Sequence, residues 1–333
     1  MRVLVVKTSS MGDVIHTLPA LTDAMRAIPG IQFDWVVEEG FAEIPGWHPA
    51  VDQVIPVAIR RWRKQLLKTW RNGEWQQYKA RLQIQKYDYV IDAQGLLKSA
   101  LLVTRLARGK RVGLDKDSAR EPLASWFYDQ SINISKNMHA VERTRKLFAG
   151  ALGYALPEEK GEYCIRDSFI AGEIDADKYL VFLHSTTRFD KHWPEVYWKQ
   201  LIGLATEAGW TICLPWGNSE EKTRAERLAD GIARVKVLPK LNLKQVTAVL
   251  AGAEACVSVD TGLSHMAAAL DRPNITLFGP TDPGLVGGYG KQQLSLESRN
   301  YSNGDQTVEP KIFASLTADV VWHELQNNLA ANV

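Results

Sequence analysis

The sequence predicts an α/β protein made of two consecutive units of parallel sheet. First, its two halves open alike: the apolar run Val3–Val6 leads into the polar loop Thr8–Asp13, and Tyr179–Leu183 leads into His184–Arg188. Second, apolar, β-branched runs alternate with helical stretches, as in parallel sheets covered on both faces. Third, 333 residues exceed one typical core and suit two domains.

The expected elements follow one another regularly along both halves. Strands are expected at Val3–Val6, Phe33–Val37, Gln53–Val57, Tyr89–Ile91, Tyr179–Leu183, Thr211–Leu214, Val235–Leu238, Ala255–Val259 and Asn274–Phe278. Helices are expected near Ala20–Ala27, Ser99–Leu106, Tyr197–Ala208, Lys222–Leu228 and Leu243–Leu250. This pattern predicts two Rossmann-like domains that face one another across a cleft. We expect the boundary between Pro157 and Lys178, where a polar stretch interrupts the alternation.

Composition and missing motifs narrow the class of protein. The 45% hydrophobic content is that of a globular protein. No apolar run approaches membrane-spanning length, and the first residues lack the features of a signal peptide, so a cytoplasmic location is expected. Cys213 and Cys256 lie in apolar runs and Cys164 is distant, which favours buried thiols over a zinc site. No G-x-G-x-x-G follows the first strand and no Walker A sequence occurs, which disfavours a nicotinamide dehydrogenase and a P-loop enzyme. The G-x-S-x-G nucleophile elbow is also missing.

The net charge of +2 hides one strongly basic stretch between Gln53 and Tyr87. It holds nine basic residues against the single acid Glu74, a local excess of eight (nine minus one). Trp62, Trp70 and Trp75 are interleaved with these cations. The partners to consider are a phosphorylated substrate, an anionic membrane surface or nucleic acid, and the alternative is a solvated helix face.

The segment Val257–Leu270 is typical of a buried strand, a polar turn and the start of a helix. At such a start, backbone N–H groups lack partners within the helix and the helix dipole favours negative charge. A phosphate group is therefore a candidate ligand of the turn Asp260–His265. The alternative is an ordinary N-cap followed by a core helix.

The first loop carries Asp13 after Gly12, where a second helix is expected to begin. As a general base, Asp13 would remove a proton from an acceptor hydroxyl; as an N-cap, it would only satisfy backbone donors. His16 is a second candidate base, although its place in the helical run also fits packing.

Three further loops follow expected strands. The loop 186–194 holds two hydroxyls and Lys191, which suit a phosphate or diphosphate, or form a capped turn with surface charges. The loop 215–221 offers a carboxylate for ribose hydroxyls, or an acidic first helical turn. The Pro-rich segment 278–283 is expected to be a stiff turn at the site. The alternative is an ordinary loop that only separates two elements.

Taken together, these segments resemble the lipopolysaccharide heptosyltransferases. Lys7–Leu21, Asp260–Ala269 and Gly279–Pro283 carry the resemblance. It continues through Asp92–Lys98, Arg120–Ala124, His139–Arg143 and Gly284–Gly290. Within the family, the chain is most similar to the enzymes that add the first heptose to the inner core.

The resemblance implies a GT-B fold with an acceptor-binding domain over residues 1–165 and a donor-binding domain over 176–318. The segment 319–333, with a helix near Trp322–Leu329, is expected to cross back onto the first domain. The implied reaction is an inverting, metal-independent transfer from ADP-L-glycero-β-D-manno-heptose to a Kdo hydroxyl of Kdo2-lipid A. No cofactor is expected. Asp115-Lys-Asp117 matches a DxD metal signature formally, but its basic middle residue argues against it.

The family's roles fall on matching positions. Asp13 is the implied catalytic base, Lys191 would stabilise the departing ADP, and Glu221 would contact the adenosine ribose. Thr186 and Thr187 would lie near the phosphates. The donor pocket would also be lined by Leu241, Asp260, Thr261, Gly262, Leu263 and His265.

The implied acceptor is anionic and lies in the cytoplasmic leaflet, which gives the basic stretch a role. Trp62 and Trp70 would touch the lipid interface, and the protein would bind peripherally to the cytoplasmic face of the inner membrane as a monomer. The acceptor would be bound by Arg60, Arg61, Arg63, Lys64, Lys98 and Arg120.

Two alternatives stay open at this stage. Heptosyltransferase II or another GT-B inner-core transferase would share the loops but require a different acceptor. A non-enzymatic nucleotide- or nucleic-acid-binding module would use the basic stretch, but no recognisable RNA- or DNA-binding motif supports it.

Overall fold

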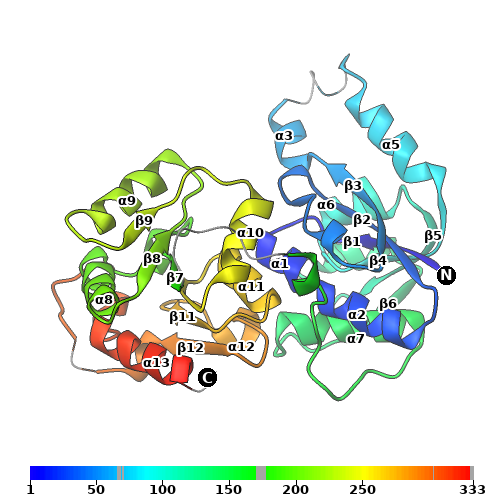
Figure 1. Ribbon diagram of the computed structural model, residues 1–333. Coiled ribbons are helices and arrows are strands. Elements are labelled where there is room, and N and C mark those ends of the chain that lie inside the picture. Colours follow the sequence, from blue (N-terminus) through cyan, green and yellow to red (C-terminus); the bar gives the residue numbers. More distant parts are fainter. Residues whose placement is uncertain (66–68, 70, 170–177, 303, 331–333) are drawn as a thin grey trace. The chain divides into compact units, whose positions relative to one another are not determined.

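The computed structural model describes residues 1–65, 69, 71–169, 178–302 and 304–330 (Figure 1). Contacts divide the chain into two units, Met1–Ile165 and Arg166–Val333. Each unit contains one six-stranded sheet in which all neighbouring strands run parallel. The predicted α/β class with two parallel sheets is thus confirmed.

Unit 1 has the strand order β3-β2-β1-β4-β5-β6. Its strands are β1 Arg2–Val6, β2 Gln32–Glu38, β3 Val51–Val57, β4 Lys86–Asp92, β5 Arg108–Leu114 and β6 Gln130–Ile132. Its helices are α1 Met11–Ile15, α2 Leu18–Ala27, α3 Ile59–Lys64, α5 Glu74–Ile84, α6 Leu97–Ser99, a π-helix Ala100–Thr104, and α7 Ala140–Leu152.

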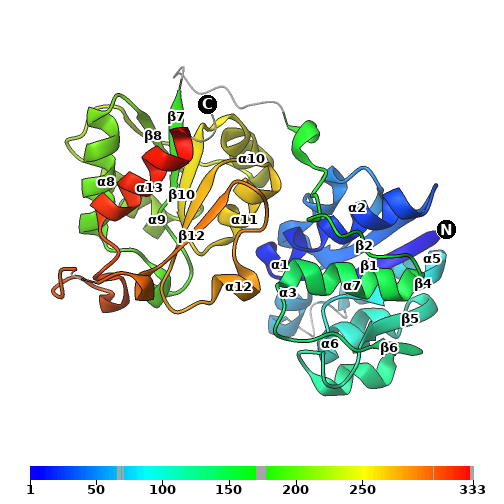
Figure 2. The ribbon, with the colours of Figure 1, turned by 90° about the horizontal axis from the view of Figure 1, so that it is seen from below.

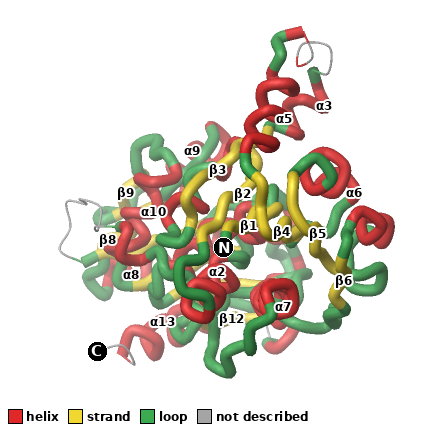
Figure 3. Tube along the Cα trace, turned by 90° about the vertical axis from the view of Figure 1, so that its right-hand side faces the viewer, coloured by secondary structure: helices red, strands yellow, loops and turns green. Residues whose placement is uncertain are grey.

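The strand order of unit 1 reverses at β1, which pairs with both β2 and β4. In open parallel sheets, ligands bind beyond the carboxyl ends of the strands at such a reversal. Figure 3 shows α2 and α7 together on one face of this sheet. On the other face, Leu4 and Val6 of β1 pack with Tyr78 and Leu82 of α5 in one apolar cluster. The polar loop after β1 therefore leaves the sheet at the expected ligand edge.

Unit 2 repeats the pattern with the order β12-β11-β10-β7-β8-β9. Its strands are β7 Tyr179–Leu183, β8 Thr211–Leu214, β9 Val235–Val237, β10 Ala255–Val259, β11 Asn274–Phe278 and β12 Gln293–Glu297. Its helices are α8 Glu195–Glu207, α9 Ser219–Ala229, α10 Leu243–Gly252, α11 Gly262–Ala269, α12 Pro283–Val286 and α13 Ala318–Ala330. The order reverses between β7 and β10, which are hydrogen-bonded neighbours.

The core of unit 2 is built around buried aromatic rings. Trp193 meets Trp198 edge-on, with ring centroids 5.0 Å apart, and Trp198 also packs on Phe182 of β7. Helix α13 lies alongside α8 and adds Val321 and Leu325 to this core (Figure 2). The strongly apolar strands β7, β10 and β11 are buried along their whole length, because helices cover both faces of the sheet.

The strands that sequence inspection did not predict are β5, β6 and β12. In β5 three basic residues and two glycines dilute the apolar signal, and only its last three residues are buried. Strand β6 has three residues, and β12 is mostly half-buried. The helix expected at Ser99–Leu106 is a single turn, α6, that continues as the π-helix.

Two further sequence predictions concern burial and the membrane. Cys213 and Cys256 are buried free thiols, as expected, and burial raises the pKa of the Cys213 thiol to about 11. Cys164 is exposed. Across the part of the chain that the structure describes, every helix is too short or too polar to cross a bilayer.

Candidate active site

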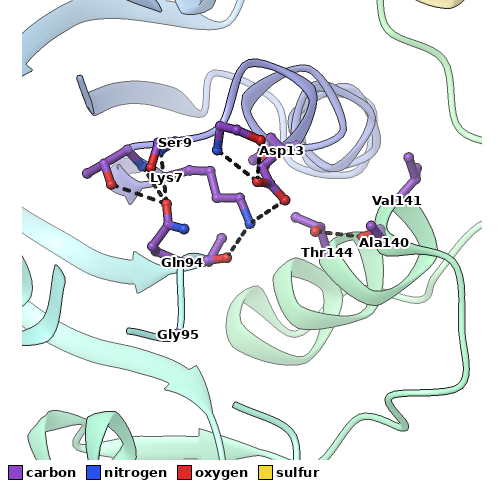
Figure 4. Close-up of polar contacts among 12 residues, drawn as sticks. Lys7, Ser9, Asp13, Gln94, Gly95, Ala140, Val141 and Thr144 are labelled. Atoms are coloured by element: carbon purple, nitrogen blue, oxygen red, sulfur yellow. Dashed lines mark hydrogen bonds and ion pairs between the residues drawn. The ribbon is translucent and has the colours of Figure 1, made fainter. Parts of the chain in front are cut away.

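Asp13 sits in the first turn of α1, just past the end of β1 (Figure 4). Its Oδ2 accepts hydrogen bonds from the backbone N–H of Ser10 at 2.7 Å and from the Ser10 hydroxyl at 2.8 Å. Ser10 is the N-cap residue, so the interpretation of Asp13 as the N-cap itself is wrong by three positions. The Asp13 side chain remains 38% exposed, which leaves it accessible to a substrate hydroxyl.

Lys7 supplies positive charge next to this carboxylate. Its Nζ lies 4.0 Å from Asp13 Oδ1 and donates to the carbonyl of Ala93 at 2.8 Å. Burial lowers the pKa of the Lys7 ammonium, while the nearby Asp13 and Asp92 carboxylates oppose that shift. An ammonium at this distance stabilises ionised Asp13, the form that a general base requires.

The loop after β4 holds the Asp13 loop in place. Gln94 Oε1 accepts from the backbone N–H groups of Thr8 at 2.8 Å and Ser9 at 3.1 Å (Figure 4). Behind it, the buried Asp92 carboxylate accepts from the backbone of Gln94 and from Thr104 Oγ1 at 2.7 Å. Burial raises the pKa of Asp92. In the sequence, only the family resemblance over Asp92–Lys98 pointed to this loop.

His16, the second candidate base, is only 3% exposed and ends α1. Its ring lies edge-on to that of His139, with centroids 5.3 Å apart. The structure therefore favours the packing interpretation of His16.

In unit 2, Lys191 and Asp260 meet across the reversal of strand order. Lys191 follows β7 and Asp260 follows β10, and Lys191 Nζ lies 2.5 Å from Asp260 Oδ2. The hydroxyl of Thr186 donates to the Asp260 carbonyl at 3.1 Å. The side chains of Lys191 and Asp260 are 19% and 10% exposed, so this cation is partly shielded from water yet reachable.

Helix α11 begins beside this ion pair at Gly262. Thr261 is its N-cap, and within the described chain the Thr261 side chain makes no capping hydrogen bond. The first-turn N–H groups of α11 are therefore suited to an anionic ligand. Leu263 is half-buried and His265 is buried in the same turn.

A buried polar cluster fixes the start of α11 against the sheet. Ser264 of α11 bonds to Ser258 of β10 at 2.9 Å and to Thr276 of β11 at 2.8 Å. The amide of Asn274 donates to both Ser264 and Thr276. All four side chains are at most 2% exposed, and each is hydrogen-bonded, as buried polar groups require.

Glu221 lies in the first turn of α9, after β8. Its Oε2 accepts from the backbone N–H of Gly217 at 2.7 Å, and its Oε1 from Asn218 Nδ2 at 2.9 Å. Asn218 in turn caps the backbone of Glu221 at 3.0 Å. Glu221 is therefore an acidic residue of a first helical turn, as one of the two interpretations predicted. Further lone pairs of the same carboxylate can still accept hydrogen bonds from ribose hydroxyls. Thr187 is exposed, and Leu241 is half-buried just before α10.

The expected acceptor residues gather at the carboxyl edge of the unit 1 sheet. Arg60, Arg61, Arg63 and Lys64 lie on α3 after β3, while Lys98 and Arg120 follow β4 and β5. All six of these side chains are exposed.

An open groove of about 410 Å³ adjoins α3. Arg61 is held there by Glu39 at 3.1 Å and by Glu74 at 2.9 Å. The guanidinium of Arg60 lies 5.6 Å above the ring of Phe41. The lining residues are Glu38, Glu39, Gly40, Phe41, Arg60, Arg61, Lys64 and Gln65. Glu38 and Glu39 precede the basic stretch, so the local positive charge is smaller than the sequence count indicates.

Trp62 does not fit the expected contact with lipid. It is 8% exposed, packs edge-on against Trp75 and Tyr78, and donates to Glu74 Oε2 at 2.8 Å. An apolar ring anchored in the core cannot also lie in a lipid interface, so this expectation is wrong in the described conformation. Trp70 lies outside the described residues.

Among the described residues, no group of three or more His, Cys, Asp or Glu side chains is placed to hold a metal ion. Asp115, from the formal DxD match, instead accepts from the backbone of Ser118 at 2.8 Å and from Asn133 Nδ2 at 2.6 Å. Hydrogen bonds from the side chains of Ser118 and Asn133, together with the bond from the Ser118 backbone, lower the pKa of Asp115. Asp115 therefore has a structural role in the turn after β5.

Two Rossmann-like sheets, each with polar loops at its strand-order reversal, match the architecture of the GT-B glycosyltransferases. The model of glycosyltransferase family 9 (heptosyltransferase) matches residues 75–316, and the chain belongs to this family. It is therefore a heptosyltransferase.

Individual relatives agree with the family. Lipopolysaccharide heptosyltransferase 1 of Escherichia coli K12 is 63% identical, over 88% of this chain and 92% of that protein. The solved E. coli heptosyltransferase WaaC with ADP is 58% identical, with a TM-score of 0.92 over 98% of this chain and 100% of that one. The same enzyme with ADP-2-deoxy-2-fluoro heptose is 57% identical, with a TM-score of 0.89 and the same coverage. The predicted resemblance is confirmed.

Proposed function

We propose that this enzyme is a heptosyltransferase I: it moves L-glycero-D-manno-heptose from ADP-heptose to a Kdo residue of Kdo2-lipid A. Transfer proceeds with inversion and without a metal ion. The observation that carries the donor assignment is the Lys191–Asp260 pair beside the start of α11. Similar solved enzymes contain ADP and a fluorinated ADP-heptose, which supports the same nucleotide class here.

The donor unit stabilises the negative charge of the leaving group. As the bond from the anomeric carbon to the diphosphate oxygen breaks, negative charge builds on the departing ADP. Lys191 and the first-turn N–H groups of α11 are preorganised to stabilise that charge. Asp260 holds Lys191 through the ion pair at 2.5 Å, and the Thr186 hydroxyl donates to the Asp260 carbonyl at 3.1 Å. These contacts fix Lys191 beside the start of α11.

The acceptor unit supplies the base. The acceptor oxygen forms the new bond to the anomeric carbon on the face opposite the departing diphosphate. Its proton passes to the Asp13 carboxylate, which Ser10 orients and Lys7 keeps ionised. The products are the heptosylated acceptor, ADP and protonated Asp13.

The same proposal includes peripheral binding of a monomer at the cytoplasmic face of the inner membrane. Exposed cations at the carboxyl edge of the unit 1 sheet support it, because lipid A phosphates and Kdo carboxylates are anionic.

The deciding experiment incubates the purified protein with ADP-heptose and Kdo2-lipid A and measures product mass. One added heptose is expected, with and without EDTA. Addition only to an acceptor that already carries a heptose would identify heptosyltransferase II instead. A folded protein that adds no heptose to either acceptor contradicts the proposal.

Asp13→Asn tests the assigned base. It keeps the shape of the side chain but cannot take the proton, so kcat is expected to fall by about 10²–10⁴. Asp129→Asn is the matched control in unit 1, since Asp129 only pairs with Arg111 on the surface. Turnover by Asp13→Asn at the rate of the control would show that another group accepts the proton.

A further inference from the structure

Two loops of the donor unit carry the groups assigned to opposite ends of ADP. Lys191 and Thr186 follow β7, while Glu221 lies in the first turn of α9, after β8. Strands β7 and β8 are paired, but the loops themselves are separate segments of chain. A ligand that needs both the phosphate end and the ribose end requires these loops at a fixed spacing.

Arg224 bridges these loops. It lies on α9, three residues after Glu221, and its Nη1 is 2.6 Å from Nδ1 of His192, the neighbour of Lys191. Its Nε lies 3.5 Å from Oε1 of Glu195 at the start of α8. The Arg224 side chain is 17% exposed, so water weakens these contacts less than it would on the surface.

The His192 ring lies in the loop after β7, the same loop that holds Thr186 and Lys191. The backbone of His184 and of Thr186 lies near the ring and raises the pKa of His192, against the larger effects of burial and of the Arg224 charge. A guanidinium only donates, so Nδ1 of His192 must accept, which requires the neutral ring with its proton on Nε2. Burial and the Arg224 charge lower the pKa of His192, which favours that neutral form.

We propose that Arg224 is a positioning residue for donor binding, which locks the Glu221 helix to the Lys191 loop through neutral His192. This inference rests on the proposed use of Lys191 and Glu221 for ADP-heptose. It assigns to Arg224 and His192 a role without contact to the nucleotide. Protonation of His192 would place two cationic donors against one another and break the link.

The groups around His192 set the sign of this pH effect. Arg224 opposes protonation from α9 and Glu220 favours it from the same helix, while His184 at the end of β7 and Glu195 on α8 complete the surroundings. Because the pKa of His192 is lowered below its ordinary value, the link is intact at pH 7. It is lost as the pH falls through that lowered pKa.

The test measures ADP binding by calorimetry and the KM values for ADP-heptose and acceptor on the full chain. Arg224→Ala is expected to weaken ADP binding by about tenfold and to raise the ADP-heptose KM, with the acceptor KM unchanged. Arg227→Ala is the matched control, because Arg227 lies on the same helix and pairs with the same Glu195 at 2.6 Å. It should stay within about twofold of the wild type.

A second pair of variants separates positioning from folding. In His192→Asn the side-chain oxygen replaces Nδ1 as the acceptor, so ADP affinity should stay near the wild-type value and no longer weaken as the pH falls. His192→Ala should lose as much affinity as Arg224→Ala, and the double variant should lose no more than either.

The outcomes distinguish the two proposals. If the wild type binds ADP and Arg224→Ala binds it equally well, the positioning role is wrong while the donor site stands. Additive losses in the double variant also contradict it. If the wild type itself does not bind ADP, the proposed function fails.

Discussion

At the scale of single residues, burial decides which side chains carry charge. His48 is 1% exposed, its Nδ1 accepts from the backbone of Ala50 at 3.2 Å, and its Nε2 meets Thr22 Oγ1 at 2.9 Å. Burial lowers the pKa of His48 to about 4. The ring is thus neutral in the folded protein at every pH at which the enzyme is expected to work.

Because His48 is buried in its neutral form, we expect the free energy of unfolding of unit 1 to fall as the pH is lowered. The unfolded chain takes up a proton on His48 below about pH 6.5, whereas the folded chain does so only near pH 4. Stability is therefore complete above pH 6.5 and falls with pH, by about 2 kcal/mol between pH 7 and pH 5.

Urea unfolding at these two pH values measures the effect. His48→Asn should reduce the loss on acidification, and His323→Gln, at an exposed position of α13, should leave it unchanged. Equal pH dependence in the wild type and His48→Asn would contradict the assignment.

At the scale of elements, α3 shows why position matters more than charge count. Two glutamates already hold Arg61, whereas Arg63 and Lys64 are exposed at the carboxyl edge of the sheet. Lys86 and Arg108 are also exposed but begin β4 and β5, at the opposite edge. The two pairs carry the same charge and differ in the strand ends that they flank.

The double variant Arg63→Gln/Lys64→Gln is expected to raise the KM for Kdo2-lipid A and to weaken retention on anionic vesicles by roughly tenfold or more at low salt. The ADP-heptose KM should not change. Lys86→Gln/Arg108→Gln is the control of equal charge. Equal losses in both double variants would point to net charge alone, and no loss in either would remove the acceptor role of α3.

At the scale of the whole molecule, the donor groups all belong to unit 2 and the proposed base belongs to unit 1. Each unit has its own buried apolar cluster. A ligand that binds only folded unit 2 therefore adds its free energy of binding to that unit.

ADP at about 100 times its Kd should stabilise unit 2 by about 2.7 kcal/mol. Hydrogen exchange read by mass spectrometry should show slower exchange in β7, β10 and α11, with β1–β4 of unit 1 unchanged. Equal protection of both units would contradict the assignment of ADP to unit 2 alone.

Some features of the fold were predictable because their physical cause is local. The bounds of β7, β8, β10 and β11 match the predicted runs residue for residue, since strands covered on both faces are rich in apolar residues. Strand β5 escaped prediction because its neighbours, not its own polar sequence, make it a strand. Its pairing with β4 and β6 joins residues distant in the chain.

The α/β class, the family, and the loops that hold Asp13, Lys191 and Asp260 could be predicted without the structure, because strand-end motifs and apolar runs are local patterns. Three other outcomes follow only from the folded chain: Lys191 pairs with Asp260, Arg224 contacts His192, and Trp62 is buried. Those outcomes depend on which strands become neighbours in the sheet. Such contacts join residues up to 69 positions apart, and no local pattern encodes them.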